Sequence, residues 1–218
     1  MRGDPEPGEK SGDTERLILF VDDNPALRLM IPDVLSQFGY HVMTAGGGEE
    51  CLEILSETIP DLIVLDIMME PMDGWATLKA IRNVPAYEDI PILILTGKVF
   101  LPIEMIRYGP EIVGWIKKPV RMGEFISLLN KVFADLRQDM TIAERMGDSL
   151  TPEERRQIAI HHRRLRVLPQ VYDGIICQCL SPARSISAGW GDETKDMENL
   201  IAEEERWCRE HGILVDDG

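Results

Sequence analysis

Short apolar runs alternate with amphipathic segments along the chain from residue 17 onward. The apolar runs are rich in β-branched residues and predict β-strands at 17–21, 41–44, 61–65, 92–95 and 113–116. The first, third and fourth are almost wholly apolar, as expected for strands buried on both faces of a parallel sheet. Segments with helical periodicity or helix caps lie at 26–38, 49–57, 75–83, 102–108 and 122–136. We therefore expect an α/β fold, a five-stranded doubly wound parallel sheet flanked by helices.

This pattern stops after about residue 139, where charged residues become frequent and helices are predicted at 151–168 and 193–211. Thr151 and Glu154 have the spacing of a capping box, so the first of these helices should begin there. Pro169 should interrupt it, because proline removes an amide donor and clashes with the preceding turn. We divide the chain into a disordered lead-in at 1–16, an α/β domain at 17–138 and a mainly helical C-terminal region at 139–218.

The two predicted C-terminal helices carry opposite charge. The first is basic through Arg155, Arg156, Arg163, Arg164 and Arg166, with His161 and His162. The second is acidic through Glu193, Glu198, Glu203, Glu204, Glu205 and Glu210. These charges favour packing of the two helices against each other, within one chain or across a dimer, and the alternative is that both faces are simply solvated.

Overall charge and composition narrow the class of protein. The formal net charge is -15, which argues against general attraction to nucleic acid or to an anionic membrane. No apolar run approaches the ~20 residues of a membrane span, and residues 1–16 lack the apolar centre of a secretory signal. Four cysteines without a CxxC pair indicate reduced thiols. We expect a cytoplasmic protein without a membrane partner.

Polar residues follow the predicted strands where each strand ends. Asp22 and Asp23 come directly after the first strand, Asp66 after the third, Thr96 after the fourth and Lys118 after the fifth. Ligands of doubly wound sheets sit beyond the carboxyl ends of the strands, so these side chains should converge on one edge.

Three neighbouring carboxylates repel one another unless a cation offsets their charge, and hard oxygen ligands suit Mg²⁺ (or Mn²⁺). Mg²⁺ is commonly bound by one or two carboxylates together with phosphate oxygens, so the cluster also indicates phosphoryl chemistry. Lys118 and the Thr96 hydroxyl are suited to contact phosphoryl oxygens.

Four ordered motifs now point to a family. They are ILFVDDN at 18–24, LIVLDIMMEPMDGW at 62–75, ILILTGK at 92–98 and GWIKKP at 114–119. Over roughly residues 17–136 the chain resembles the phospho-accepting receiver domain of bacterial and archaeal two-component response regulators. The resemblance implies a flavodoxin-like sheet of strand order 2-1-3-4-5.

The resemblance also implies roles for individual residues. Asp66 would accept a phosphoryl group from a sensor histidine kinase. Asp22, Asp23 and Asp66 would hold Mg²⁺ together with the main-chain carbonyl of Met68. The protein would then be a phosphorelay switch rather than an enzyme, with at most slow self-dephosphorylation.

Two further roles concern how the phosphorylated state is recognised. By resemblance, Thr96 and Lys118 sense the phosphate, and Trp115 stands at the aromatic switch position. Trp115 is larger than the usual Tyr or Phe there, and a plain core tryptophan is the alternative. Met68 places a bulky apolar side chain beside the phosphoryl site, and we hypothesise that it slows loss of the phosphate.

The C-terminal region would carry the output of such a switch. The C-terminal region resembles no output domain, so we favour protein contacts with an effector or a second copy in a homodimer. A DNA-binding transcriptional regulator acting through the basic helix at 155–166 is the alternative. A phosphatase of the haloacid-dehalogenase type is a third class, but Met68 stands where such enzymes carry a second aspartate.

Overall fold

The computed structural model describes residues 16–98, 101–146, 150–179 and 191–213. All of the predicted lead-in except Arg16 therefore lies outside the described residues. The chain divides into two compact units. The first contains Met1–Lys98 and Trp115–Ser127, and the second contains Val99–Gly114 and Leu128–Gly218.

A parallel sheet of five strands confirms the predicted fold class. The strands are β1 (Arg16–Val21), β2 (Tyr40–Ala45), β3 (Leu62–Leu65), β4 (Ile92–Thr96) and β5 (Gly114–Lys117). Their order is β2-β1-β3-β4-β5, the flavodoxin-like order. The side chains of β3 and β4 are buried throughout, as the apolar runs predicted.

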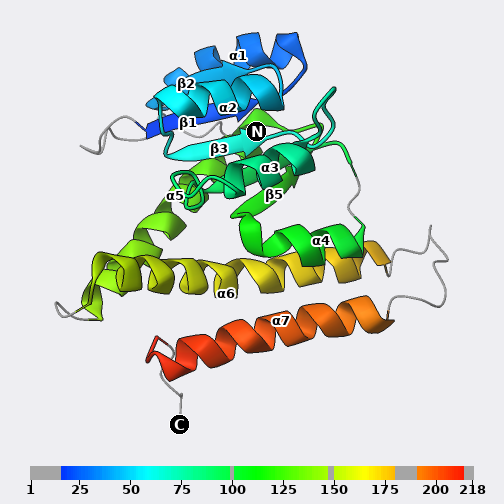
Figure 1. Ribbon diagram of the computed structural model, residues 1–218. Coiled ribbons are helices and arrows are strands. Elements are labelled where there is room, and N and C mark those ends of the chain that lie inside the picture. Colours follow the sequence, from blue (N-terminus) through cyan, green and yellow to red (C-terminus); the bar gives the residue numbers. More distant parts are fainter. Residues whose placement is uncertain (1–15, 99–100, 147–149, 180–190, 214–218) are drawn as a thin grey trace, which may run out of the picture. The chain divides into compact units, whose positions relative to one another are not determined.

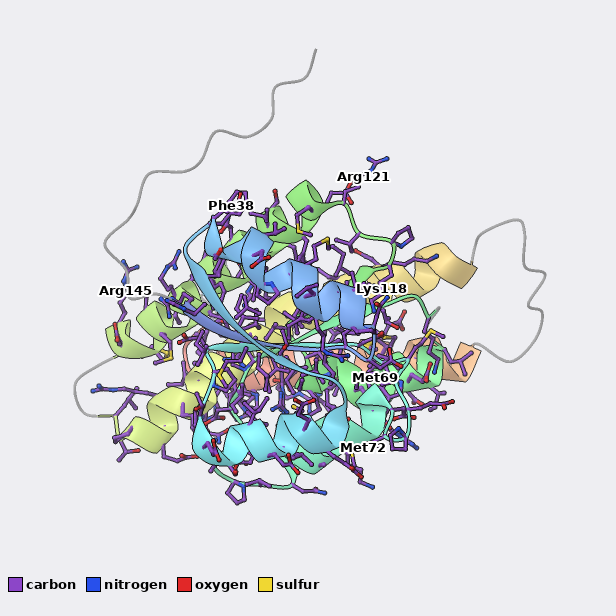
Figure 2. All side chains as sticks on the ribbon, turned by 90° about the horizontal axis from the view of Figure 1, so that it is seen from above. Phe38, Met69, Met72, Lys118, Arg121 and Arg145 are labelled. Carbon is purple, nitrogen blue, oxygen red and sulfur yellow. The ribbon has the colours of Figure 1, made fainter. Side chains whose placement is uncertain are left out.

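Helices follow the strands as βα units require. They are α1 (Pro25–Ser36), α2 (Gly48–Glu57), α3 (Gly74–Arg82), α4 (Pro102–Tyr108) with the short 3-10 helix η1 (Gly109–Glu111), and α5 (Met122–Arg145). In Figure 2, α1 and α2 lie on opposite sides of the sheet, which is the doubly wound arrangement. Helix α5 is longer than predicted and continues through residue 139.

The start of α1 shows how local capping decides a helix boundary. Asn24 is the N-cap, and its side chain accepts a hydrogen bond from the Ala26 amide. Pro25 occupies the first helical position, where its missing N–H costs nothing. Pro32 lies inside the same helix.

Two long helices form the C-terminal region, α6 (Pro152–Cys179) and α7 (Gly191–Glu210), and they pack side by side (Figure 1). The predicted capping box is present, since Glu154 accepts from the Thr151 amide and the Thr151 hydroxyl accepts from the Glu154 amide. The prediction that Pro169 interrupts the helix is wrong, because α6 continues through it. Val167 and Leu168, directly before the proline, are buried. Full burial of a Val or Leu side chain contributes about 1.5–3 kcal/mol, which for two of them is comparable to the roughly 3 kcal/mol that an internal proline costs a helix.

Within the part of the chain that the structure describes, no helix is both long and apolar enough to cross a membrane.

Candidate functional site

Strand register brings the first two aspartates to one edge of the sheet. Val21, the last residue of β1, pairs with Leu65, the last residue of β3. The next residues along the two strands are Asp22 and Asp66, and the Asp66 amide donates to the Val21 carbonyl at 2.9 Å. In the same way, the Lys118 amide after β5 donates to the Thr96 carbonyl at 2.8 Å. The site is therefore assembled by main-chain hydrogen bonds between neighbouring strand ends.

Three carboxylates meet at this edge. One carboxylate oxygen from each of Asp22, Asp23 and Asp66 lies within 4.8 Å of the others. Asp22 is 0% and Asp66 is 4% exposed, whereas Asp23 faces solvent. Such oxygen ligands suit Mg²⁺ or Mn²⁺, so the donor set fits the predicted ion.

Lys118 bridges the two buried carboxylates. Its ammonium nitrogen Nζ donates to Asp22 Oδ2 and to Asp66 Oδ2, both at 2.6 Å. Burial by itself lowers the pKa of the Lys118 ammonium. The hydrogen bonds and Coulombic attraction of Asp22 and Asp66 outweigh that effect and raise the pKa above its ordinary value. Lys118 is therefore held as a cation that balances part of the carboxylate charge.

Thr96 and Met68 lie around this centre. Thr96 is 1% exposed, and its hydroxyl oxygen accepts from the Lys98 amide at 3.1 Å. The Met68 amide donates to Asp66 Oδ1 at 3.0 Å, while 60% of Met68 is exposed. The backbone after Asp66 thus curls around its carboxylate, and a Cβ atom on Gly97 would lie 4.0 Å from the Met68 sulfur. The assignment of the Met68 carbonyl as a metal ligand stays a prediction.

Figure 2 shows the end of the sheet where these loops meet. It labels Lys118, which follows β5, and Met69, which comes from the loop after β3, and both lie at that end. Trp115 lies on β5 and is half-buried. Its predicted role as a switch stays a prediction.

Gly74 explains how the loop after β3 can turn so tightly. The Gly74 amide donates to the Ile67 carbonyl at 3.0 Å. A Cβ atom added to Gly74 would overlap the Asp66 main-chain oxygen and lie 2.6 Å from the Ile67 Cα. Only glycine permits this approach, and Asp73 then caps α3 by accepting from the Ala76 amide at 2.7 Å.

Arg28 is a site residue that the sequence patterns did not identify. Its Nη1 donates to the Asp22 carbonyl at 2.7 Å, so α1 holds the loop that carries the aspartate pair. A Cβ atom on Gly46 would lie 3.2 Å from both the Arg28 guanidinium carbon and Glu50 Oε2. Arg28 and Glu50 therefore come together over Gly46, whose amide donates to Glu50 Oε2 at 2.6 Å. The sequence signal is weak, since arginine on an amphipathic helix usually faces solvent.

The fold and these strand-end residues define a receiver domain. Residues 18–130 match the family described as the response regulator receiver domain. This is more than half of the 218 residues, and the chain belongs to that family of two-component signalling proteins. Proteins of this family are signalling switches, and the family binds Mg²⁺ through acidic residues.

Individual relatives agree with this assignment. The chemotaxis protein CheY of Bacillus subtilis (strain 168) is 34% identical over 115 residues, which cover 52% of this chain and 94% of CheY. A solved structure of CheY4 from Vibrio cholerae is 31% identical with a TM-score of 0.51, and the match covers 55% of this chain and 99% of CheY4.

Longer relatives match only in part. The "Probable transcriptional regulator ycf27" of Guillardia theta is 39% identical over 85 residues, which cover 39% of this chain and 32% of that protein. Across the four proteins of that name, the chain spans between 32% and 46% of their length.

We predict that Lys118→Met destabilises the metal-free protein by about 1–3 kcal/mol, because two buried carboxylates lose their cation. Added Mg²⁺ should stabilise this variant more than it stabilises the wild type, since the ion replaces the missing positive charge. Urea unfolding with EDTA and with saturating Mg²⁺ measures both effects. Lys117→Met, at the exposed neighbouring position, is the matched control and should change neither quantity. Equal Mg²⁺ dependence in all three proteins would contradict the role given to Lys118.

Proposed function

We propose that the protein is a phosphorelay response regulator in which Asp66 accepts a phosphoryl group from the phosphohistidine of a sensor histidine kinase. The observation that carries this proposal is the buried Asp66 carboxylate, which shares the Lys118 ammonium with Asp22 beside the exposed Asp23. An aspartate is ionised at neutral pH and needs no general base to act as a nucleophile.

The transfer forms a bond between an Asp66 carboxylate oxygen and phosphorus and breaks the bond between phosphorus and the histidine nitrogen. Asp22, Asp23 and Asp66 would hold Mg²⁺ or Mn²⁺, which offsets charge on the transferring group when bound. Lys118 would exchange one carboxylate partner for a phosphoryl oxygen, and the Thr96 hydroxyl would bond another. These new contacts bias the protein toward its active conformation.

Repeated turnover is not part of this proposal. Met68 occupies the position two residues after the nucleophile, where haloacid-dehalogenase phosphatases carry an acid/base aspartate. A thioether does not take up or release a proton at neutral pH. We therefore propose a switch that keeps its phosphate rather than a phosphatase.

We propose protein contacts, rather than DNA binding, as the output. The basic side chains of α6 are paired within the protein: Arg166 with Asp135 and Asp139, and Arg164 with Glu111 and Glu204. Cations that are already paired release few counterions on meeting a phosphate backbone, so they supply little affinity for a duplex. The longer relatives named as transcriptional regulators share only part of their length with this chain.

Phosphorylation can be tested on the intact chain. Incubation with acetyl phosphate and Mg²⁺ should add one phosphoryl group, measured by intact-protein mass spectrometry. Asp66→Asn should abolish the adduct, because an amide is not a competent acceptor. Asp33→Asn, at an exposed position on α1, is the matched control and should keep it. An adduct that persists in Asp66→Asn would disprove the assignment of the acceptor.

We also predict that Met68→Asn shortens the half-life of the phosphorylated protein several-fold. The Met68 side chain, two residues after Asp66, would shield the acyl phosphate from water, whereas an amide at this position would help to orient a water molecule. The decay of the adduct mass after removal of the phosphodonor gives the half-life. Met140→Asn, which changes another exposed methionine, should leave it unchanged. An unaltered half-life in Met68→Asn would refute the shielding role.

A further inference from the structure

A cavity of about 420 Å³ lies between α1 and the segment that leads from β5 into α5. Its lining comes from β1, α1, β4 and the start of α5, all within the first compact unit. Figure 2 shows α1 and Arg121, which directly precedes α5, on the same side of the sheet. Met30 and Pro119 line the cavity and are exposed, so solvent reaches it. Its volume is in the range of about 300–1,000 Å³ that is usual for small-molecule sites.

The lining of this cavity is mostly apolar. It includes the buried side chains of Phe20, Ile31 and Phe125. Met30 of α1 and Met122 of α5 add thioether side chains, whose flexibility lets them adapt to the shape of an occupant. Water in such a cavity has few hydrogen-bond partners, and an apolar molecule that displaces poorly held water gains affinity. The lining therefore suits an apolar molecule.

Lys118 gives the cavity its polar group. Of the described residues that line the cavity, Lys118 alone has a polar side chain. Its ammonium group has three N–H donors, and Asp22 Oδ2 and Asp66 Oδ2 accept one each. The third donor is left for an acceptor outside this bridge. An occupant with one acceptor oxygen could use it.

The charge around Lys118 selects between a neutral and an anionic occupant. The carboxylates of Asp22, Asp23 and Asp66 gather at this end of the sheet and outnumber the single ammonium. A further anion would add to the negative charge there, and like charges at short range repel. A ketone, ether or hydroxyl oxygen accepts a hydrogen bond without adding a charge. The site therefore favours a neutral acceptor.

We propose that this cavity is a binding site for a neutral, mainly apolar small molecule with one hydrogen-bond acceptor, and that the acceptor takes the third N–H of Lys118. At the packing density of about 0.74 found in protein interiors, the occupant has a van der Waals volume of about 300 Å³. This inference goes beyond the proposed function and does not depend on phosphorylation of Asp66.

Binding of a neutral fluorescent ketone to the full-length protein tests the site. The probe is Prodan, a dimethylaminonaphthalene with one ketone oxygen, whose emission moves to shorter wavelength when it leaves water. Titration in the presence of EDTA should show saturable binding to the wild type. Met30→Trp should weaken the binding at least tenfold, because the indole occupies part of the cavity. Leu29→Trp is the matched control, since Leu29 is 77% exposed and does not line the cavity, and it should bind as the wild type does.

Urea unfolding shows that each variant is folded before its affinity is compared. An absence of saturable binding to the wild type would overturn the proposal. Equal affinities of the wild type and a folded Met30→Trp would also overturn it, because the dye would then bind elsewhere.

Two analogues of the probe test the recognition of its oxygen. The naphthoate in which a carboxylate replaces the ketone should bind the wild type at least tenfold more weakly than Prodan, and equal or tighter binding would overturn the assignment of a neutral ligand. The propyl analogue, which lacks the ketone oxygen, tests the contact with Lys118. The ratio of its dissociation constant to that of Prodan should fall several-fold in Lys118→Met. An unchanged ratio would show that Lys118 does not bind the acceptor.

Discussion

The bridge from Lys118 to Asp22 and Asp66 is the interaction on which the site depends. The sheet places two carboxylates next to each other in buried positions, and mutual repulsion opposes that arrangement. One ammonium, 2.6 Å from an oxygen of each, offsets the repulsion. Under the proposed function, a metal ion in this site would share the neutralisation of the carboxylates with Lys118, and a phosphoryl group on Asp66 would offer the Lys118 ammonium a new partner. Lys118 would then link phosphorylation of Asp66 to the loop that leads into α5.

The sequence was sufficient to predict the sheet and the composition of this centre. Apolar runs marked the strands, and the strand-end rule brought Asp22, Asp66 and Lys118 to one edge. Both inferences depend on features that are visible within a single segment of the sequence. These features are a run of apolar residues, which indicates burial on two faces, and a polar residue where the strand ends. The sequence did not predict Arg28, because its contact is with a main-chain carbonyl and depends on how α1 packs. The role of Gly74 was not predicted for the same reason, because its close approach to the Asp66 main chain exists only in the folded protein.

The C-terminal helices differ from what local residue preferences predict. Pro169 carries a strong local preference against a helix interior, yet α6 continues through it beside the buried Leu168. The charge pattern correctly suggested that α6 and α7 pack together. It did not reveal that Asp139 of α5 is a main partner of α6, because a single aspartate on a predicted helix resembles any exposed acid. Arg164 and Arg166 of the basic helix therefore have acidic partners inside the chain.

The central claim is that Lys118 transfers from a carboxylate bridge to the group carried by Asp66. A crystal structure with Mg²⁺ and beryllium fluoride, a stable mimic of the phosphoryl group, tests it most directly. The account predicts beryllium bound to an Asp66 carboxylate oxygen, the metal on Asp22 and Asp23, and Lys118 Nζ in contact with a fluorine atom. A beryllium adduct at Asp66 with Lys118 still bridging Asp22 and Asp66 would contradict it.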